Sequence, residues 1–298
     1  MFATNGRDYV DRERRIAGPH GPEEKFHEHY RPERHGAHSG ASSGIGAVYA
    51  DRLAKRGNDL ILVARNRSRL ATLAHRLKLE TKRSVETLVA DLNDKADLAT
   101  VEMVLRTNTS ITMLVNNAGM GATQPLLTAN IDRMDEMIGV NVGALTRLTY
   151  AAVPGFVARG GGTIINIASV VAIVPELLNG VYGGTKAFVL AFGHSLQHEL
   201  AEKNVRVQSV LPGATATEFW DLSGRPVHQL PSAIVMSAEA MVDAALAGLD
   251  QGETVTIPAL ANKAEWDRFE AARRAMSGHL SSAVPAPRYI VRTPNAAA

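Results

Sequence analysis

The 298-residue sequence contains no cysteine, which excludes disulfides and metal sites built from thiolates. It also lacks an apolar run near the roughly 20 residues that a membrane-spanning helix needs, and its start lacks the pattern of a secretory signal. An excess of either charge is missing too, because 32 basic and 30 acidic side chains leave a net charge of +2. These absences predict a soluble, cytoplasmic protein with no membrane or nucleic-acid partner.

Short apolar runs alternate along the chain with stretches of helical length. The runs predict strands at 59–64, 84–90, 112–115, 163–167, 205–211 and 254–257. The intervening stretches predict helices at 45–57, 67–80, 94–107, 129–158, 181–203 and 238–250. Such alternation indicates a parallel sheet with helices on both faces. We therefore expect an α/β, Rossmann-type doubly wound fold.

A glycine-rich segment precedes the first predicted helix. Its glycines, Gly40, Gly44 and Gly46, allow a tight turn and close approach to a phosphate. The N-terminus of the following helix offers free N–H groups and the positive end of the helix dipole. Because the segment opens a strand–helix series, it predicts a phosphate-binding loop.

Polar or turn-forming residues follow the predicted strands, where ligands bind in doubly wound sheets. Each has an ordinary alternative: Asp91 suits a helix cap, Ser169 a surface hydroxyl, and Pro212-Gly213 a turn. Their common position at one edge of the sheet favours a binding site. The set is Arg65, Asp91, Leu92, Asn116, Asn117, Ala118, Gly119, Ser169, Pro212 and Gly213.

Tyr182 and Lys186 are four residues apart in a predicted helix and therefore lie on one face. A neighbouring ammonium favours phenolate and is expected to lower the pKa of Tyr182. This pair is a candidate general acid/base for an alcohol or an alkoxide, although the spacing alone is a weak signal.

Together these segments resemble the classical short-chain dehydrogenase/reductase family from residue 39 to about 260. The resemblance implies that Asn141 holds a proton-relay water and that Ser169 positions the substrate oxygen. It further implies that Tyr182 exchanges the proton and that Lys186 lowers the tyrosine pKa and binds the nicotinamide ribose. All four positions occur in the family's order and spacing.

The resemblance also implies a dinucleotide site. Residues 39–46 match the family's cofactor motif, with Ser39 where threonine is usual. At the end of the second strand, where NAD-binding members carry an acid, the chain has Ala64, followed by Arg65 and Arg67, so NADP(H) is favoured over NAD(H). The implied cofactor residues are Ser39, Gly40, Ser42, Ser43, Gly44, Ile45, Gly46, Arg65, Asp91, Leu92, Asn117, Ala118, Gly119, Tyr182, Lys186, Pro212, Gly213 and Thr217.

The substrate is less visible. Residues 214–232 occupy the place of the family's substrate loop, and apolar side chains such as Phe219, Trp220, Leu222 and Val227 either line a pocket or pack beneath the loop. The resemblance implies a small molecule with a carbonyl or secondary alcohol, no metal, and a homo-oligomer paired through the helices at 129–158 and 181–203.

The first 38 residues are polar and rich in histidine, and this composition predicts a disordered arm. We expect a catalytic domain at 39–265 and a C-terminal helix and tail at 266–298. His20, His27, His29, His35 and His38 are interpreted as solvated rather than metal-binding. The arm stands where the fold needs an apolar first strand, so we expect that strand to be atypical or missing. A non-catalytic binding protein is the alternative function.

A misread frame is one hypothesis for this segment. If the bases that encode Gly36-Ala37-His38 are read one base later, they can encode Ala-Leu followed by a codon that begins with AT, which usually encodes Ile. That apolar run is what the fold requires. Sequencing the gene through codon 38 tests the hypothesis, and an unbroken frame contradicts it.

Overall fold

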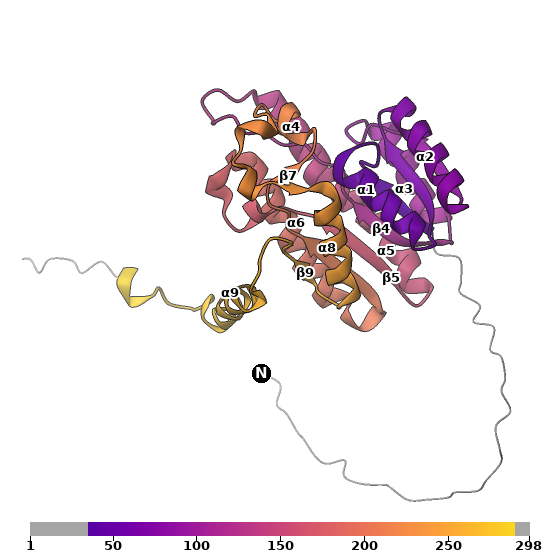
Figure 1. Ribbon diagram of the computed structural model, residues 1–298. Helices are drawn as coiled ribbons and strands as arrows, with labels where there is room; N and C mark the ends of the chain where they lie inside the picture. Colours follow the sequence, from indigo (N-terminus) through magenta and orange to yellow (C-terminus); the bar gives the residue numbers. More distant parts are fainter. Residues whose placement is uncertain (1–34, 290–298) are drawn as a thin grey trace, which may run out of the picture. The chain divides into compact units, whose positions relative to one another are not determined.

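Seven parallel strands form the centre of the computed structural model, which describes residues 35–289 (Figure 1). Their order across the sheet is β3-β2-β1-β4-β5-β6-β9. The order reverses between β1 and β4, which creates the crevice where doubly wound folds bind ligands. The bounds are β1 His35–Ser39, β2 Asp59–Ala64, β3 Val85–Val89, β4 Ile111–Asn116, β5 Gly162–Ile167, β6 Val205–Val210 and β9 Val255–Thr256.

Helices cover both faces of the sheet. On one face pack α1 Gly44–Lys55, α2 Arg67–Thr81 and α8 Ala238–Asp250. On the other pack α3 Lys95–Thr107, α5 Leu145–Ala158 and α6 Gly180–Glu199. The predicted Rossmann-type fold is confirmed.

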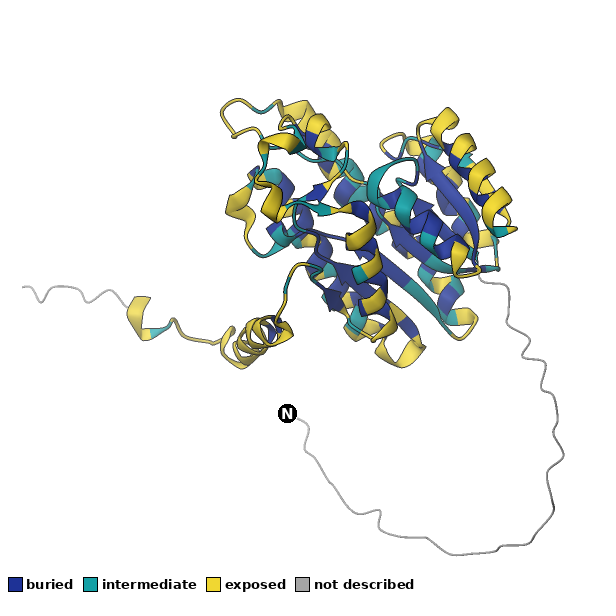
Figure 2. Cartoon of the chain, viewed as in Figure 1, coloured by how far each residue is buried: buried dark blue, intermediate teal, exposed yellow. Residues whose placement is uncertain are grey.

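Strand β2 shows why the sheet needs both layers. Leu60 and Leu62 point into the cluster under α1, α2 and α8, whereas Ile61 and Val63 point into the cluster under α3 and α5. Since successive side chains face opposite sides of a sheet, a strand covered on both faces has to be apolar throughout. Figure 2 shows the sheet as a buried interior between exposed helix surfaces.

The first strand is present, at the middle of the sheet. His35–Ser39 pairs with β2 on one side and β4 on the other, so the expectation that it is missing is wrong. The predicted arm therefore overlaps the sheet, because the strand begins before residue 39. Backbone groups form the ladder whatever the side chains are, and Gly36 and Ala37 are small enough to be buried. His20, His27 and His29 lie outside the described residues.

His38 makes this strand atypical. Its side chain is fully buried, and within residues 35–289 neither ring nitrogen has a hydrogen-bond partner. Burial lowers the pKa of His38 to about 3, so the imidazole is neutral. A buried polar group without a partner costs about 1–3 kcal/mol. The strand therefore forms at a cost that an apolar residue would avoid.

The remaining elements include one predicted helix that is divided in two and a small two-stranded sheet. The predicted helix at 129–158 consists of α4 Ile131–Ile138, a π-helical turn Gly139–Ala144, and α5. Between β6 and α8 lie the short strands β7 Thr215–Ala216 and β8 Met236–Ser237, which pair with each other, and the short helix α7 Phe219–Leu222. The expected boundary at residue 265 falls inside α9 Lys263–Ala275. Across the described part of the chain, every helix is too short or too polar to cross a bilayer.

Candidate active site

A cavity of about 1140 Å³ opens at the carboxyl ends of the strands. The glycine-rich loop, the ends of β2 to β6 and the segment after β6 contribute to its wall. The sequence-predicted residues on that wall are Gly40, Ser42, Ser43, Gly44, Ile45, Arg65, Asp91, Leu92, Asn117, Ala118, Gly119, Ser169, Tyr182, Lys186, Pro212, Gly213 and Thr217. The structure thus brings together residues that are far apart in sequence.

Ser39, Gly46 and Asn141 do not line the cavity; they support it from behind. The Ser39 hydroxyl oxygen accepts hydrogen bonds from the N–H groups of Asn117 and Ala118, each at 3.1 Å. It donates in turn to the carbonyl of Val115. These bonds join the end of β1 to the end of β4, so the glycine loop is anchored although the strand before it is atypical.

The glycine loop requires its glycines. Gly40 has φ +67°, a conformation that other residues rarely adopt, and a Cβ there would lie 2.8 Å from the Cα of Ala118. A Cβ on Gly46 would lie 2.2 Å from the carbonyl oxygen of Gly40. Ser43, Gly44 and Ile45, at the start of α1, line the cavity. Because the first N–H groups of a helix have no partner within the helix, this end of α1 suits the pyrophosphate of a dinucleotide.

Tyr182 and Ser169 form the reactive centre of the cavity. Both side chains are buried, and the Tyr182 hydroxyl is hydrogen-bonded to Ser169. Ser169 also lies 3.4 Å from the carbonyl oxygen of Pro212 and accepts a bond from Val171 N–H. Burial raises the pKa of Tyr182 to about 12, while the Ser169 bond lowers it by less. The phenol therefore keeps its proton at neutral pH.

Lys186 lies one helical turn from Tyr182 on α6, as the spacing predicted. Its Nζ atom is 5.8 Å from the centre of the tyrosine ring and donates a 2.8 Å hydrogen bond to the carbonyl of Ile167. Burial lowers the pKa of Lys186 to about 8. The expected lowering of the Tyr182 pKa is not found, because desolvation of the buried phenol outweighs any effect of the ammonium.

Asn141 occupies the π-helical turn between α4 and α5. Its amide makes a pair of hydrogen bonds with the backbone of Met120, at 2.8 and 2.9 Å, and donates to the Thr185 hydroxyl at 3.0 Å. A π-helical turn in a longer helix commonly marks a functional position. Asn141 thus connects the loop after β4 to the helix that carries Tyr182 and Lys186.

The end of β2 carries a basic group that the sequence analysis only partly identified. Arg65 lines the cavity, and its Nη1 atom is 3.9 Å from the Asp91 carboxylate. Arg67 does not line it. Arg69, which was missed, does line it and forms a 2.6 Å ion pair with Glu218. The side chain of Asn66 caps α2 by accepting a hydrogen bond from Arg69 N–H, so Arg69 lies in the first turn of this helix.

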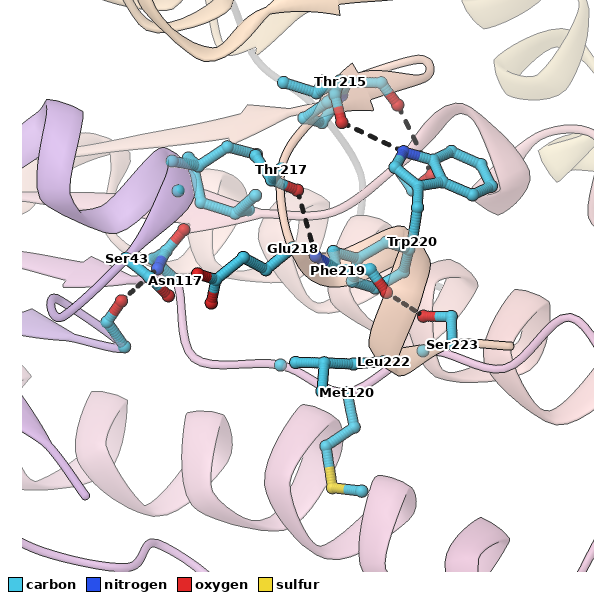
Figure 3. Close-up of a pocket in the computed structure, with 18 of the residues that line it drawn as sticks. Ser43, Asn117, Met120, Thr215, Thr217, Glu218, Phe219, Trp220, Leu222 and Ser223 are labelled. Carbon is cyan, nitrogen blue, oxygen red and sulfur yellow. Dashed lines mark hydrogen bonds between the residues drawn. The ribbon is translucent and has the colours of Figure 1, made fainter. Parts of the chain in front are cut away.

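The segment after β6 closes the other side of the cavity (Figure 3). Phe219 contacts the Tyr182 ring, with centroids 5.7 Å apart. Trp220 is buried and donates from its indole N–H to the carbonyl of Thr215, so it packs beneath the segment as well as lining the cavity. Val227 does not line the cavity. Apolar wall residues that the sequence analysis did not identify include Met120, Val171, Leu177, Leu178, Leu230, Ile234 and Met236.

Several known proteins resemble this chain in sequence and in fold. A family model described as "short chain dehydrogenase" matches residues 38–225. A short-chain dehydrogenase from Sphingobium yanoikuyae in complex with NADPH is 46% identical, and the match covers 86% of this chain and 100% of that chain with a TM-score of 0.84. A bulky-bulky ketone specific alcohol dehydrogenase from Comamonas testosteroni is 42% identical over 86% of this chain and 98% of that one, with a TM-score of 0.80.

A more distant relative is the very-long-chain 3-oxoacyl-CoA reductase of Bos taurus. It is 34% identical over 212 residues, which are 68% of this chain and 66% of that protein. The Comamonas and Bos taurus proteins are named for different substrates, so likeness alone does not assign one.

Proposed function

The chain belongs to the short-chain dehydrogenase family, and from this premise we propose that it is an NADP(H)-dependent oxidoreductase acting on a carbonyl or secondary alcohol. The observation that carries the proposal is the buried Tyr182 hydroxyl, bonded to Ser169 in a cavity that the glycine loop also lines. The non-catalytic alternative rested on a missing first strand, and β1 removes that reason.

Each catalytic side chain has a role that follows from its position. The bound nicotinamide would supply the hydride that reaches the carbonyl carbon. Ser169 would donate a hydrogen bond to the substrate oxygen, and Tyr182 would donate the proton that converts the developing alkoxide to an alcohol. Lys186 would stabilise the phenolate that remains, and Asn141 would keep the loop at Met120 in place.

The proposed cofactor is NADP(H). Arg65 and Arg69 line the cavity at the end of β2, where the strand ends in Ala64 instead of an acid. Guanidinium groups bind phosphate with paired hydrogen bonds. The Sphingobium relative, which is bound to NADPH, supports the same assignment.

The proposed substrate is a ketone that carries bulky apolar groups on both sides. Phe219, which contacts the Tyr182 ring, lines the cavity together with Leu222 and Leu177. Apolar walls favour substrates whose flanking groups leave water. The specificity named for the Comamonas relative supports this class.

The proposed assembly is a homo-oligomer in the cytoplasm. On α5 and α6 an aromatic row of Tyr150, Phe192 and Phe188 is stacked, and Tyr150 is 69% exposed. An exposed aromatic row of this kind is typical of a protein contact. Light scattering on the purified chain tests the assembly, and a monomeric mass would contradict it.

Activity is tested by following NADPH oxidation with a series of ketones of increasing size, from acetone to ketones with two aromatic substituents. We expect turnover with the bulky ketones and little with acetone. Binding of NADPH without oxidation by any carbonyl compound, in protein whose fold is intact, would contradict the proposed reaction.

A further inference from the structure

An ion pair on the cavity wall joins two residues that are 149 positions apart in the sequence. Arg69 Nη1, on the first turn of α2, lies 2.6 Å from Glu218 Oε2, which immediately precedes α7. Both residues line the cavity, and their side chains are 48% and 55% exposed. The pair therefore joins the end of the site near Arg65 to the segment that carries Phe219.

The surroundings of Glu218 place its carboxylate near the phosphate loop. A Cβ on Gly44 would lie 3.0 Å from the Thr217 methyl carbon, so the residue before Glu218 lies against the glycine loop. Figure 3 shows the Glu218 side chain extending toward Ser43 and Asn117, away from Trp220. An anion at this position would compete with the phosphates of a bound dinucleotide for the same positive groups.

Building on the proposed function, we propose that Arg69 is a second specificity-determining residue for the 2′-phosphate of NADP(H), and that Glu218 is the internal anion that this phosphate displaces. Arg69 pairs with a carboxylate and lines the same end of the cavity as Arg65, where β2 ends and α2 begins. A phosphate offers more charge and more acceptor oxygens than the carboxylate. NADH has a hydroxyl group where NADPH has the 2′-phosphate, so it offers no anion to Arg69 at that position.

Glu218 can affect cofactor binding in two ways, by repelling the pyrophosphate or by occupying Arg69. If the carboxylate only repels the pyrophosphate, then its removal favours NADPH and NADH equally. If it occupies Arg69, its removal favours NADPH alone. An exposed ion pair is weak, and breaking it therefore changes affinity by no more than about fivefold.

The test is a double-mutant cycle read by cofactor binding, with nicotinamide fluorescence as the signal. Glu218→Gln is expected to tighten NADPH binding by about two- to fivefold and to change NADH binding by less than twofold. Arg69→Ala is expected to weaken NADPH about tenfold with little effect on NADH. In Arg69→Ala protein, adding Glu218→Gln is expected to leave the ratio of the two affinities unchanged.

Two matched controls complete the cycle. Asp221→Asn removes a carboxylate from α7 that does not line the cavity, and Arg67→Ala removes an arginine from α2 that does not line it either. Both are expected to change the affinity ratio by less than twofold. Adenosine 2′,5′-bisphosphate, as a competitor of NADPH, is expected to follow the same order of variants.

The outcomes distinguish this inference from the proposed function. One outcome is that the unaltered protein shows a clear preference for NADPH while Arg69→Ala weakens the binding of NADPH and NADH equally. That result overturns the inference and leaves the proposed function standing. Equal tightening of both cofactors by Glu218→Gln also overturns it. Failure of the unaltered chain to bind NADPH refutes the proposed function itself.

Discussion

Lys186 Nζ lies 5.8 Å from the centre of the Tyr182 ring, and its hydrogen bond goes to the backbone of Ile167 rather than to the phenol oxygen. The two buried groups respond oppositely to desolvation, since the pKa of Tyr182 rises to about 12 and that of Lys186 falls to about 8. At neutral pH the tyrosine thus keeps its proton and has a cation beside it. This state suits reduction of a carbonyl.

Removing the Tyr182 hydroxyl tests its role as the proton donor. Tyr182→Phe should lower kcat for ketone reduction by at least about 10²-fold, because general acid catalysis contributes 10²–10⁴-fold. NADPH affinity should change little, since the ring remains. Tyr150→Phe, at an exposed tyrosine, is the control and should retain activity. Comparable turnover in the two variants would refute the assignment.

The pKa of Lys186 predicts the alkaline limb of the pH profile. As pH rises through about 8 the ammonium is lost, whereas Tyr182 with a pKa of about 12 stays protonated. Because kcat/KM reports the ionisations of free enzyme and substrate, kcat/KM for reduction of a non-ionising ketone should fall above about pH 8. The measurement is a pH–rate profile in buffers of constant ionic strength. A profile that stays flat to pH 10 would disprove the role of the cation.

Arg65 should contribute to cofactor choice. Arg65→Ala is expected to weaken NADPH binding about tenfold and NADH binding by less than twofold, since a charge-assisted bond to phosphate is lost in only one case. Fluorescence titration with both cofactors measures the ratio. Equal losses for the two cofactors would rule out a 2′-phosphate contact at this residue.

His38 should limit the stability of the fold. His38→Val removes the two buried ring nitrogens that lack partners in the described region and should raise the free energy of unfolding by about 1–3 kcal/mol. The measurement is denaturant unfolding at pH 7. An apolar residue at this position is also what the shifted reading frame would supply. A loss of stability in the variant would contradict this account of β1.

The same residue predicts a pH dependence of stability. The folded-state pKa of His38 is about 3 against an ordinary value of 6.5, so only the unfolded chain binds a proton between these values. Stability should therefore fall as pH drops from 6.5 toward 3. His38→Val should reduce this slope, and His75→Gln, at an exposed position, should leave it unchanged. Equal slopes in all three proteins would show that His38 does not titrate as described.

The regular part of the fold could be predicted from the sequence because its strands are covered on both faces. Asp59–Ala64 is predicted with the bounds that the structure has, since an apolar run of that length fits only a buried strand. Strand β1 could not be predicted, because its identity comes from pairing with β2 and β4. Gly36, Ala37 and His38 carry no strand signal of their own.

The positions of the site residues could be predicted where a sequence motif fixes the backbone. Their protonation could not, because it depends on how deeply each side chain is buried. The positions of Tyr182 and Lys186 follow from helical spacing, but the direction of the tyrosine pKa depends on burial that spacing does not reveal. Arg69 was not predicted because Arg65, Arg67 and Arg69 occur at every second position near the start of α2 and look alike in the sequence. Which of them line the cavity depends on where α2 begins, and the residue types alone do not fix that start.

The central claim, a working NADP(H) site on this sheet, is tested most directly by titrating the purified chain with NADPH and NADH while following nicotinamide fluorescence. The account predicts saturable binding of NADPH that is at least about tenfold tighter than that of NADH. Tighter binding of NADH, or no binding of either by protein with an intact fold, would contradict it.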